Sequence, residues 1–122
     1  MKEVLVVEDD ILNLKLICEI LRTEGYTVHN AMNGIDAIDM AKKMPYDLIL
    51  MDIQLPGMDG IEATGIIKNM PNFKKVPIIA LTAYAMGGDK ERFLAAGLDD
   101  YIPKPLNISD FLIKVNKYCS HD

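Results

Sequence analysis

The chain has 122 residues, of which 50% are hydrophobic and 25% are charged, a composition typical of one soluble globular domain. Its formal net charge of −5 argues against a long basic groove, so we expect no nucleic-acid partner. No apolar run approaches the ~20 residues of a membrane span, and the chain opens on a strand pattern, so we expect a cytoplasmic protein without a membrane partner.

Short apolar runs alternate with helical patterns along the chain, which is the signature of βα units on a parallel sheet. The expected strands cover 4–7, 27–28, 48–51, 77–81 and 101–102, and the expected helices lie near 11–24, 34–43, 60–69, 88–96 and 108–118. The first, third and fourth strands are apolar throughout, so they should be central, with the other two at the edges. Five such units predict a flavodoxin-like, doubly wound α/β fold with the strand order 2-1-3-4-5.

The apolar residues of the first predicted helix fall into two groups. The group at helical spacing that we expect to face the sheet is Leu16, Ile17, Ile20 and Leu21. The group left on the outer side is Leu12, Leu14 and Cys18. Gly25 is the natural residue to end this helix, and Asp10 is the expected N-cap. Cys18 and Cys119 have no metal-ligand spacing, which fits a reducing compartment.

Two later helices begin with pairs of residues that resemble capping boxes. Asp59 and Glu62 stand three residues apart at the start of the third predicted helix. Asn107 and Asp110 have the same spacing at the start of the fifth. These pairs predict that the helices start close to residues 60 and 108.

Polar residues directly follow four of the predicted strands. They are Glu8-Asp9-Asp10, Asp52, Thr82 and Lys104-Pro105. Because the carboxyl ends of parallel strands form one ligand-binding edge, these residues should meet. Crowded carboxylates repel one another, and a cation or a lysine stabilises their ionised forms. The sequence therefore predicts a divalent metal beside a lysine and a hydroxyl.

The expected metal is Mg²⁺, with Mn²⁺ as a substitute, because the ligands are hard oxygens without histidine or cysteine. Asp9 and Asp52 would share the ion, Glu8 would reach it through a water, and Gln54 could offer its backbone carbonyl.

A carboxylate beside Mg²⁺ can attack phosphorus and form an acyl phosphate. Lys104, the Thr82 hydroxyl and backbone N–H groups would balance the charge of the phosphoryl oxygens. Ala83 is small and leaves room for the phosphoryl group.

These stretches closely resemble the receiver domain of bacterial two-component response regulators, over essentially the whole chain. The motifs are V-L-V-V-E-D-D at 4–10, L-I-L-M-D-I-Q-L-P-G-M-D-G at 48–60, I-I-A-L-T-A at 78–83 and Y-I-P-K-P at 101–105. Within the family, the sequence looks most like single-domain cell-division regulators, and receivers fused to hybrid histidine kinases look similar. The first motif has Glu-Asp where many relatives have Asp-Asp, which bears on how directly Glu8 touches metal.

The resemblance implies a role for each site residue. Asp52 would be the phosphoacceptor, and Lys104 would be the phosphate-binding lysine. The Mg²⁺ site would consist of Asp9, Glu8 and the Gln54 carbonyl. Thr82 and Tyr101 would be the switch pair. The phosphoryl donor would be a phosphohistidine on a histidine kinase or histidine phosphotransfer protein. Residues 1–122 would form one receiver domain without an output domain, which acts on a downstream protein partner as a monomer or weak dimer. Its only catalysis would be its own phosphorylation and dephosphorylation.

Four finer expectations concern residues around this site. Thr82 and Tyr101 are expected to end neighbouring strands, so that Thr82 moves toward the phosphoryl group and Tyr101 turns inward. The Lys104-Pro105 bond is expected to be cis, which the resemblance supports more than the sequence does. Tyr84 would shield the phosphoryl group from water. Leu12 would serve kinase docking, because it lies beside the acidic pocket.

Several alternatives compete with this interpretation. A flavin- or nucleotide-binding module would need a glycine- or hydroxyl-rich phosphate loop after the first strand, where this chain has three acids. An aspartyl phosphatase would need an acid at position 54, which is Gln54. A receiver that signals without phosphate, a phosphate-relay intermediate without conformational output, and a receiver excised from a hybrid histidine kinase share the same motifs.

Overall fold

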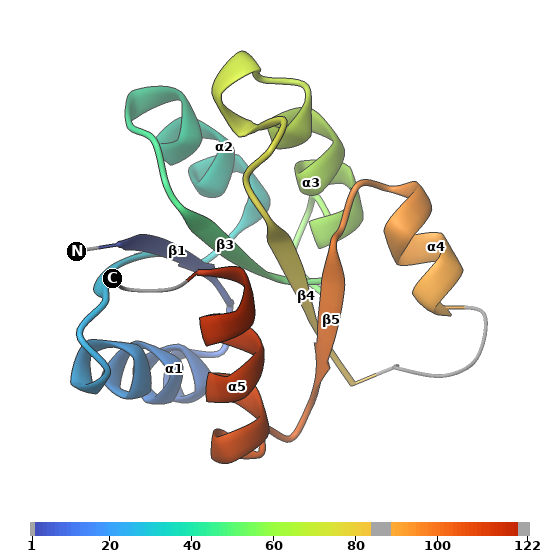
Figure 1. The fold of residues 1–122 in the computed structure, drawn as a ribbon. Helices are drawn as coiled ribbons and strands as arrows, with labels where there is room; N and C mark the ends of the chain where they lie inside the picture. Colours follow the sequence, from blue (N-terminus) through green and yellow to red (C-terminus); the bar gives the residue numbers. More distant parts are fainter. Residues whose placement is uncertain (1, 84–88, 120–122) are drawn as a thin grey trace.

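Five parallel strands form one sheet with the order β2-β1-β3-β4-β5, which confirms the predicted flavodoxin-like α/β fold (Figure 1). The structure is a computed structural model and describes residues 2–83 and 89–119. The strands are β1 (Glu3–Val7), β2 (Thr27–Ala31), β3 (Leu48–Asp52), β4 (Ile78–Thr82) and β5 (Asp100–Pro103). The helices are α1 (Ile11–Thr23), α2 (Gly34–Lys43), α3 (Gly60–Lys68), α4 (Asp89–Ala95) and α5 (Ile108–Tyr118), with a short 3-10 helix η1 (Pro71–Phe73).

The sheet separates two hydrophobic cores. Helices α1 and α5 cover one face, and α2, α3 and α4 cover the other (Figure 1). All residues of β3 and β4 are buried, as expected for central strands of a parallel sheet. The edge strands β2 and β5 run longer than predicted. His29 and Asn30 interrupt the apolar pattern of β2, and Asp100 and Pro103 flank the short apolar run of β5. None of the helices in the described parts of the chain is long and apolar enough to cross a bilayer.

The predicted sheet-facing side of α1 was partly wrong. The buried residues of this helix are Leu14, Ile17, Cys18 and Leu21. Leu16, which we expected inside, is 45% exposed, whereas Leu12 is 74% exposed as predicted. Both apolar groups have helical spacing, so the rotation of the helix about its axis decides which of them is buried. That rotation is set by the connection from β1 and by packing on the sheet.

Capping residues fix both ends of α1. The Asp10 carboxylate accepts hydrogen bonds from the N–H groups of Leu12 and Asn13, which confirms Asp10 as the N-cap. At the other end Gly25 has a φ of 95°, and its N–H donates to the Arg22 carbonyl. Only glycine adopts this left-handed conformation at little cost, so Gly25 ends the helix as predicted.

The starts of α3 and α5 are also as predicted. Asp59 accepts a hydrogen bond from the Glu62 N–H at 2.8 Å, and Asn107 accepts one from the Asp110 N–H at 3.0 Å. Each side chain satisfies a helix N–H that has no partner within the helix. These caps set where each helix leaves the carboxyl edge of the sheet.

Gly60 brings the start of α3 into direct contact with the end of β3. A Cβ atom at position 60 would lie 2.1 Å from the Asp52 carbonyl oxygen, far inside van der Waals contact. The Gly60 N–H donates to the Ile53 carbonyl at 3.0 Å. Because the clash would be with backbone, relief requires that α3 or the end of β3 moves.

We predict that Gly60→Ala destabilises the protein by about 1–3 kcal/mol, the usual cost of an overpacked site. Gly65 in the same helix is the matched control, because a Cβ there meets nothing within 4 Å. Gly65→Ala should instead stabilise by about 0.5–1 kcal/mol through helix propensity. Urea unfolding of both variants measures the difference, and equal stabilities would contradict the close contact.

Candidate functional site

Three carboxylates gather at the carboxyl edge of the sheet. Glu8 follows β1 and Asp52 ends β3, and these strands are neighbours in the sheet. One carboxylate oxygen each from Glu8, Asp9 and Asp52 lies within 4.8 Å of the others. Glu8 and Asp52 are 0% and 3% exposed, whereas Asp9 is exposed. The predicted cluster therefore exists, with two buried members and one at the surface.

Lys104 links the two buried carboxylates. Its ammonium nitrogen lies 2.8 Å from Glu8 Oε1 and 3.1 Å from Asp52 Oδ2. The contact with Asp52 is a hydrogen bond, whereas Glu8 Oε1 has no aligned hydrogen-bond donor among the described residues. A buried carboxylate oxygen without such a donor is costly. Glu8 Oε1 is therefore paired by the charge of Lys104, while Glu8 Oε2 accepts a hydrogen bond from the Asp10 N–H at 3.2 Å.

The charges in this cluster alter one another's protonation. Burial, and then the neighbouring Asp52 carboxylate, raises the pKa of Glu8, and Lys104 only partly offsets these effects. For Lys104, burial alone would lower the pKa, but Glu8 and Asp52 outweigh burial and raise it. Lys104 is thus a fixed cation in a site with an excess of carboxylates, an excess that a further cation would balance.

The donor set fits a hard divalent ion. Mg²⁺ and Mn²⁺ prefer carboxylate oxygens, and these three side chains come from two adjacent strand ends. The Gln54 N–H donates to Asp52 Oδ1 at 2.9 Å, which fixes the other side of the Asp52 carboxylate. Whether the Gln54 carbonyl and a water on Glu8 complete the ligand set stays a prediction.

Thr82 lies at the same edge, as predicted. It ends β4, is 2% exposed, and its carbonyl accepts a hydrogen bond from the Lys104 N–H at 2.8 Å. Ala83 is exposed and, with Lys104 and Glu8, lines a hollow beside the cluster. The Lys104-Pro105 peptide bond is cis, which confirms that prediction.

The predicted position of Tyr101 was wrong in one respect. Tyr101 pairs with Ala80 near the start of β5, and Pro103 is the residue opposite Thr82. The strand continues past Tyr101 to Pro103, and the sequence did not show this because proline is unusual within a strand. Since side chains alternate along strands, Tyr101 and Thr82 nevertheless face the same side of the sheet. Tyr101 is partly buried and packs against the core on that side.

Other residues selected from the sequence have mixed outcomes. Leu12 is exposed at the start of α1, two residues after the acidic run. Tyr84 lies outside the described residues. Sequence reasoning missed Gly60 and Lys114, which contacts Tyr101. An Asp-Gly step at a helix start could have indicated Gly60, but no local pattern links Lys114 to Tyr101.

Comparison with known proteins gives a consistent result. Residues 4–116 match the family profile described as the response regulator receiver domain. The chain is 41% identical to the polar-differentiation response regulator DivK of Brucella anthropi, over 96% of this chain and 95% of that protein. The DivK of Brucella melitensis is 40% identical with the same coverage.

Solved structures show the same likeness. The receiver domain of a sensor histidine kinase from Pseudomonas aeruginosa, which has a magnesium ion coordinated in its active-site cleft, is 42% identical. The alignment covers 96% of both chains with a TM-score of 0.89. The chemotaxis protein CheY4 of Vibrio cholerae is 29% identical, covers 97% of this chain and 98% of its own, and has a TM-score of 0.93.

We predict that Mg²⁺ stabilises this protein and that Asp9→Ala removes most of the effect. At free Mg²⁺ of 100 times its Kd, the wild type should gain about 2.7 kcal/mol. Asp9→Ala should leave the metal-free stability level or higher, because it removes a ligand and relieves repulsion. Thermal melting with and without Mg²⁺ measures both quantities. Asp39→Ala, at an exposed position on α2, is the control, and an unchanged response in Asp9→Ala would place the metal elsewhere.

Proposed function

Because this chain belongs to the family of response regulator receiver domains, we propose that it accepts a phosphoryl group on Asp52 in a two-component phosphorelay. The observation that carries the proposal is the setting of the Asp52 carboxylate. One oxygen accepts the Gln54 N–H and the other faces the Lys104 ammonium, at a strand end beside two more carboxylates. This arrangement orients a nucleophile and supplies a cation next to it.

The proposed reaction transfers a phosphoryl group between two side chains. The N–P bond of a donor phosphohistidine breaks as a bond forms between phosphorus and an Asp52 carboxylate oxygen. The departing imidazole nitrogen takes one proton from solvent water, so that the histidine leaves as neutral imidazole. Lys104 donates a hydrogen bond to the Asp52 carboxylate. Its ammonium group would therefore lie close to the phosphoryl oxygens and stabilise the negative charge that accumulates on them. Bound Mg²⁺, held by Asp9, Asp52 and Glu8, would neutralise further negative charge. Thr82 would donate its hydroxyl to a phosphoryl oxygen.

The output would be a change of shape at the β5 edge of the sheet. Thr82 moving toward the phosphoryl group would vacate space on the face that Tyr101 shares, so that the ring can turn inward. This change would alter the surface of α4, β5 and α5 and the affinity for a downstream protein. A Tyr101 ring signal in nuclear magnetic resonance that does not move on phosphorylation would contradict it.

The alternatives differ in how the phosphoryl group is used. As a single receiver of residues 1–122 without an output domain, the chain would act through a separate protein, in line with its likeness to DivK. A receiver excised from a hybrid histidine kinase is favoured by the likeness to the Pseudomonas aeruginosa domain. A pure relay intermediate would pass the phosphoryl group on without a change of shape. All versions act in the cytoplasm.

We expect Asp52 to be the sole phosphorylation site. Incubation with acetyl phosphate and Mg²⁺ should add one phosphoryl mass to the wild type, read by intact-mass spectrometry. Asp52→Asn keeps the volume but loses the anionic nucleophile, so the added mass should disappear. Asp39→Asn, at an exposed position on α2, is the control and should behave as the wild type does. Phosphorylation of Asp52→Asn at the wild-type rate, or steady turnover of p-nitrophenyl phosphate, would refute the proposal.

Leu12 is proposed to dock the phosphohistidine donor. It is 74% exposed on the first turn of α1, close to the acidic cluster. Leu12→Ala should slow transfer from a histidine phosphotransfer protein by about tenfold, the equivalent of 1.4 kcal/mol, an apolar contact of ordinary size. Phosphorylation by acetyl phosphate should stay unchanged, because that donor needs no docking surface. Ile35→Ala, at a site 61% exposed on α2, is the control, and equal slowing by both variants would remove the docking role.

A further inference from the structure

Side chains bind both backbone groups of Tyr101. β5 is an edge strand that pairs only with β4. The Tyr101 N–H donates to Asp100 Oδ1 at 2.8 Å, and the Tyr101 carbonyl accepts from Lys114 Nζ at 2.8 Å. Lys114 Nζ lies 3.2 Å from the same Asp100 oxygen. Asp100, Tyr101 and Lys114 thus form a closed ring of contacts, which we call the β5 clamp.

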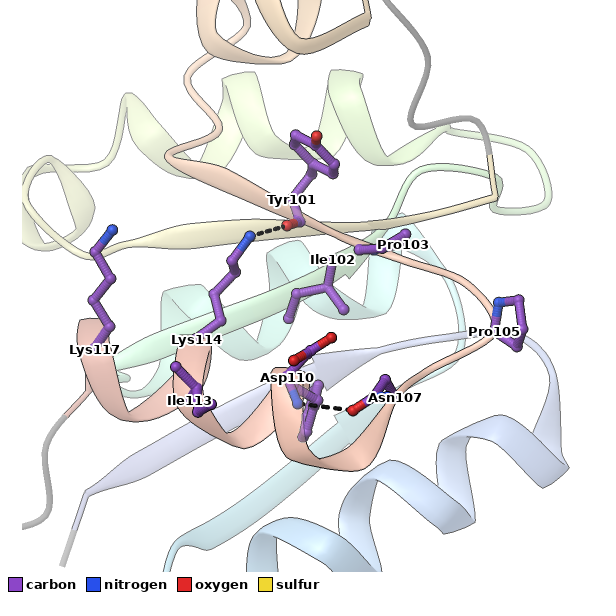
Figure 2. Close-up of a pocket in the computed structure, with 10 residues that line it drawn as sticks. Tyr101, Ile102, Pro103, Pro105, Asn107, Asp110, Ile113, Lys114 and Lys117 are labelled. Carbon is purple, nitrogen blue, oxygen red and sulfur yellow. Dashed lines mark hydrogen bonds between the residues drawn. The ribbon is translucent and has the colours of Figure 1, made fainter.

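The lysine of the clamp also contacts the Tyr101 ring. Lys114 Nζ lies 5.2 Å from the ring centroid, within the range of a cation–π interaction. Figure 2 shows the Lys114 side chain rising from α5 to the Tyr101 carbonyl, while the ring points away from α5 on the far side of β5. One ammonium group therefore contacts both the backbone and the side chain of the residue proposed to switch.

The surroundings keep Lys114 in this position. Asp100 also accepts a hydrogen bond from the Tyr118 hydroxyl at 2.9 Å. Burial would raise the pKa of Asp100, but the Tyr101 N–H, Tyr118 and Lys114 outweigh burial and lower it, so the carboxylate stays charged at neutral pH. Val115, next to Lys114 on α5, is fully buried in the core and fixes the helix against the sheet.

We propose that Lys114 is a positioning residue that holds the Tyr101 ring in its present orientation and so sets the balance of the switch before phosphorylation. This inference rests on the proposed function. The backbone hydrogen bond to Lys114 can persist in either ring orientation, but the cation–π contact is made only while the ring stays near the ammonium. A contact present in one state and lost in the other shifts the equilibrium between them. The charge of Lys114 therefore opposes rotation of the Tyr101 ring away from its present orientation.

The test measures the Tyr101 ring directly. The full chain is labelled with 3-fluorotyrosine, and the Tyr101 signal in ¹⁹F magnetic resonance is assigned with Tyr101→Phe. Acetyl phosphate with Mg²⁺ supplies the phosphorylated limit, and intact mass confirms the modification. Lys114→Met removes the charge but keeps a long apolar side chain. In the unphosphorylated protein it should raise the ratio of rings in the phosphorylated orientation to rings in the present orientation about two- to fivefold, the range expected for an exposed cation–π contact.

Matched variants separate charge from structure. Lys114→Arg keeps a cation that can contact the Tyr101 ring, and should keep the ring in its wild-type orientation. Lys117→Met removes a lysine of the same helix that lies over Tyr118 at 5.3 Å, and should also leave the Tyr101 signal unchanged. Asp100→Asn removes the carboxylate charge that pairs with Lys114. It should shift the Tyr101 signal in the same direction as Lys114→Met. If Lys114→Met does not fold, Asp100→Asn decides the outcome alone.

The results distinguish this inference from the proposed function. A wild-type Tyr101 signal that stays in place while Asp52 is phosphorylated would overturn the switch itself. A wild-type signal that moves on phosphorylation, together with Lys114→Met and Asp100→Asn signals equal to the unphosphorylated wild type, would overturn only the role of Lys114. A shift in Lys117→Met as large as that in Lys114→Met would also overturn it, because the effect would then be one of general charge.

Discussion

Lys104 is a single cation shared by two buried carboxylates, and the whole carboxyl edge of the sheet depends on it. Removing Glu8 and Asp52 from water is costly, and truncating one partner of such a group typically costs about 3–5 kcal/mol. One ammonium cannot balance two carboxylates, and Asp9 adds a third at the surface. The protein therefore folds with an unbalanced negative charge in a fixed place. That imbalance favours the binding of a divalent cation at this edge of the sheet.

The sheet connects this edge to both cores at once. Odd and even residues of each strand face opposite sides, so β4 supplies Leu81 to the core under α1 and α5, and Ala80 to the core under α2, α3 and α4. Asp52 and Thr82 stand at the ends of strands that belong to both cores. A change in charge at these ends can thus act on either layer. Tyr101 packs on the side of the sheet that α2, α3 and α4 cover.

The sequence was sufficient where a feature depends on neighbouring residues. The apolar runs of β3 and β4, the cap at Asp10 and the turn at Gly25 each follow from a short stretch of chain, and all were predicted. The buried side of α1 was not, because the groups containing Leu14 and Leu16 both have helical spacing and only packing selects between them. Lys114 was missed for a related reason. Its partners are 13 and 14 residues away and meet it only once α5 has docked against β5.

The β5 clamp has a consequence for how other chains can approach this protein. An edge strand with free N–H and C=O groups is a template on which a foreign strand can add, the usual route to domain swapping and aggregation. At Tyr101 both groups are already engaged, by Asp100 and by Lys114. An incoming backbone would have to displace both of these side-chain hydrogen bonds to pair with Tyr101. Strand addition at this point of β5 is therefore disfavoured, which favours recognition of β5 through its side chains over extension of the sheet.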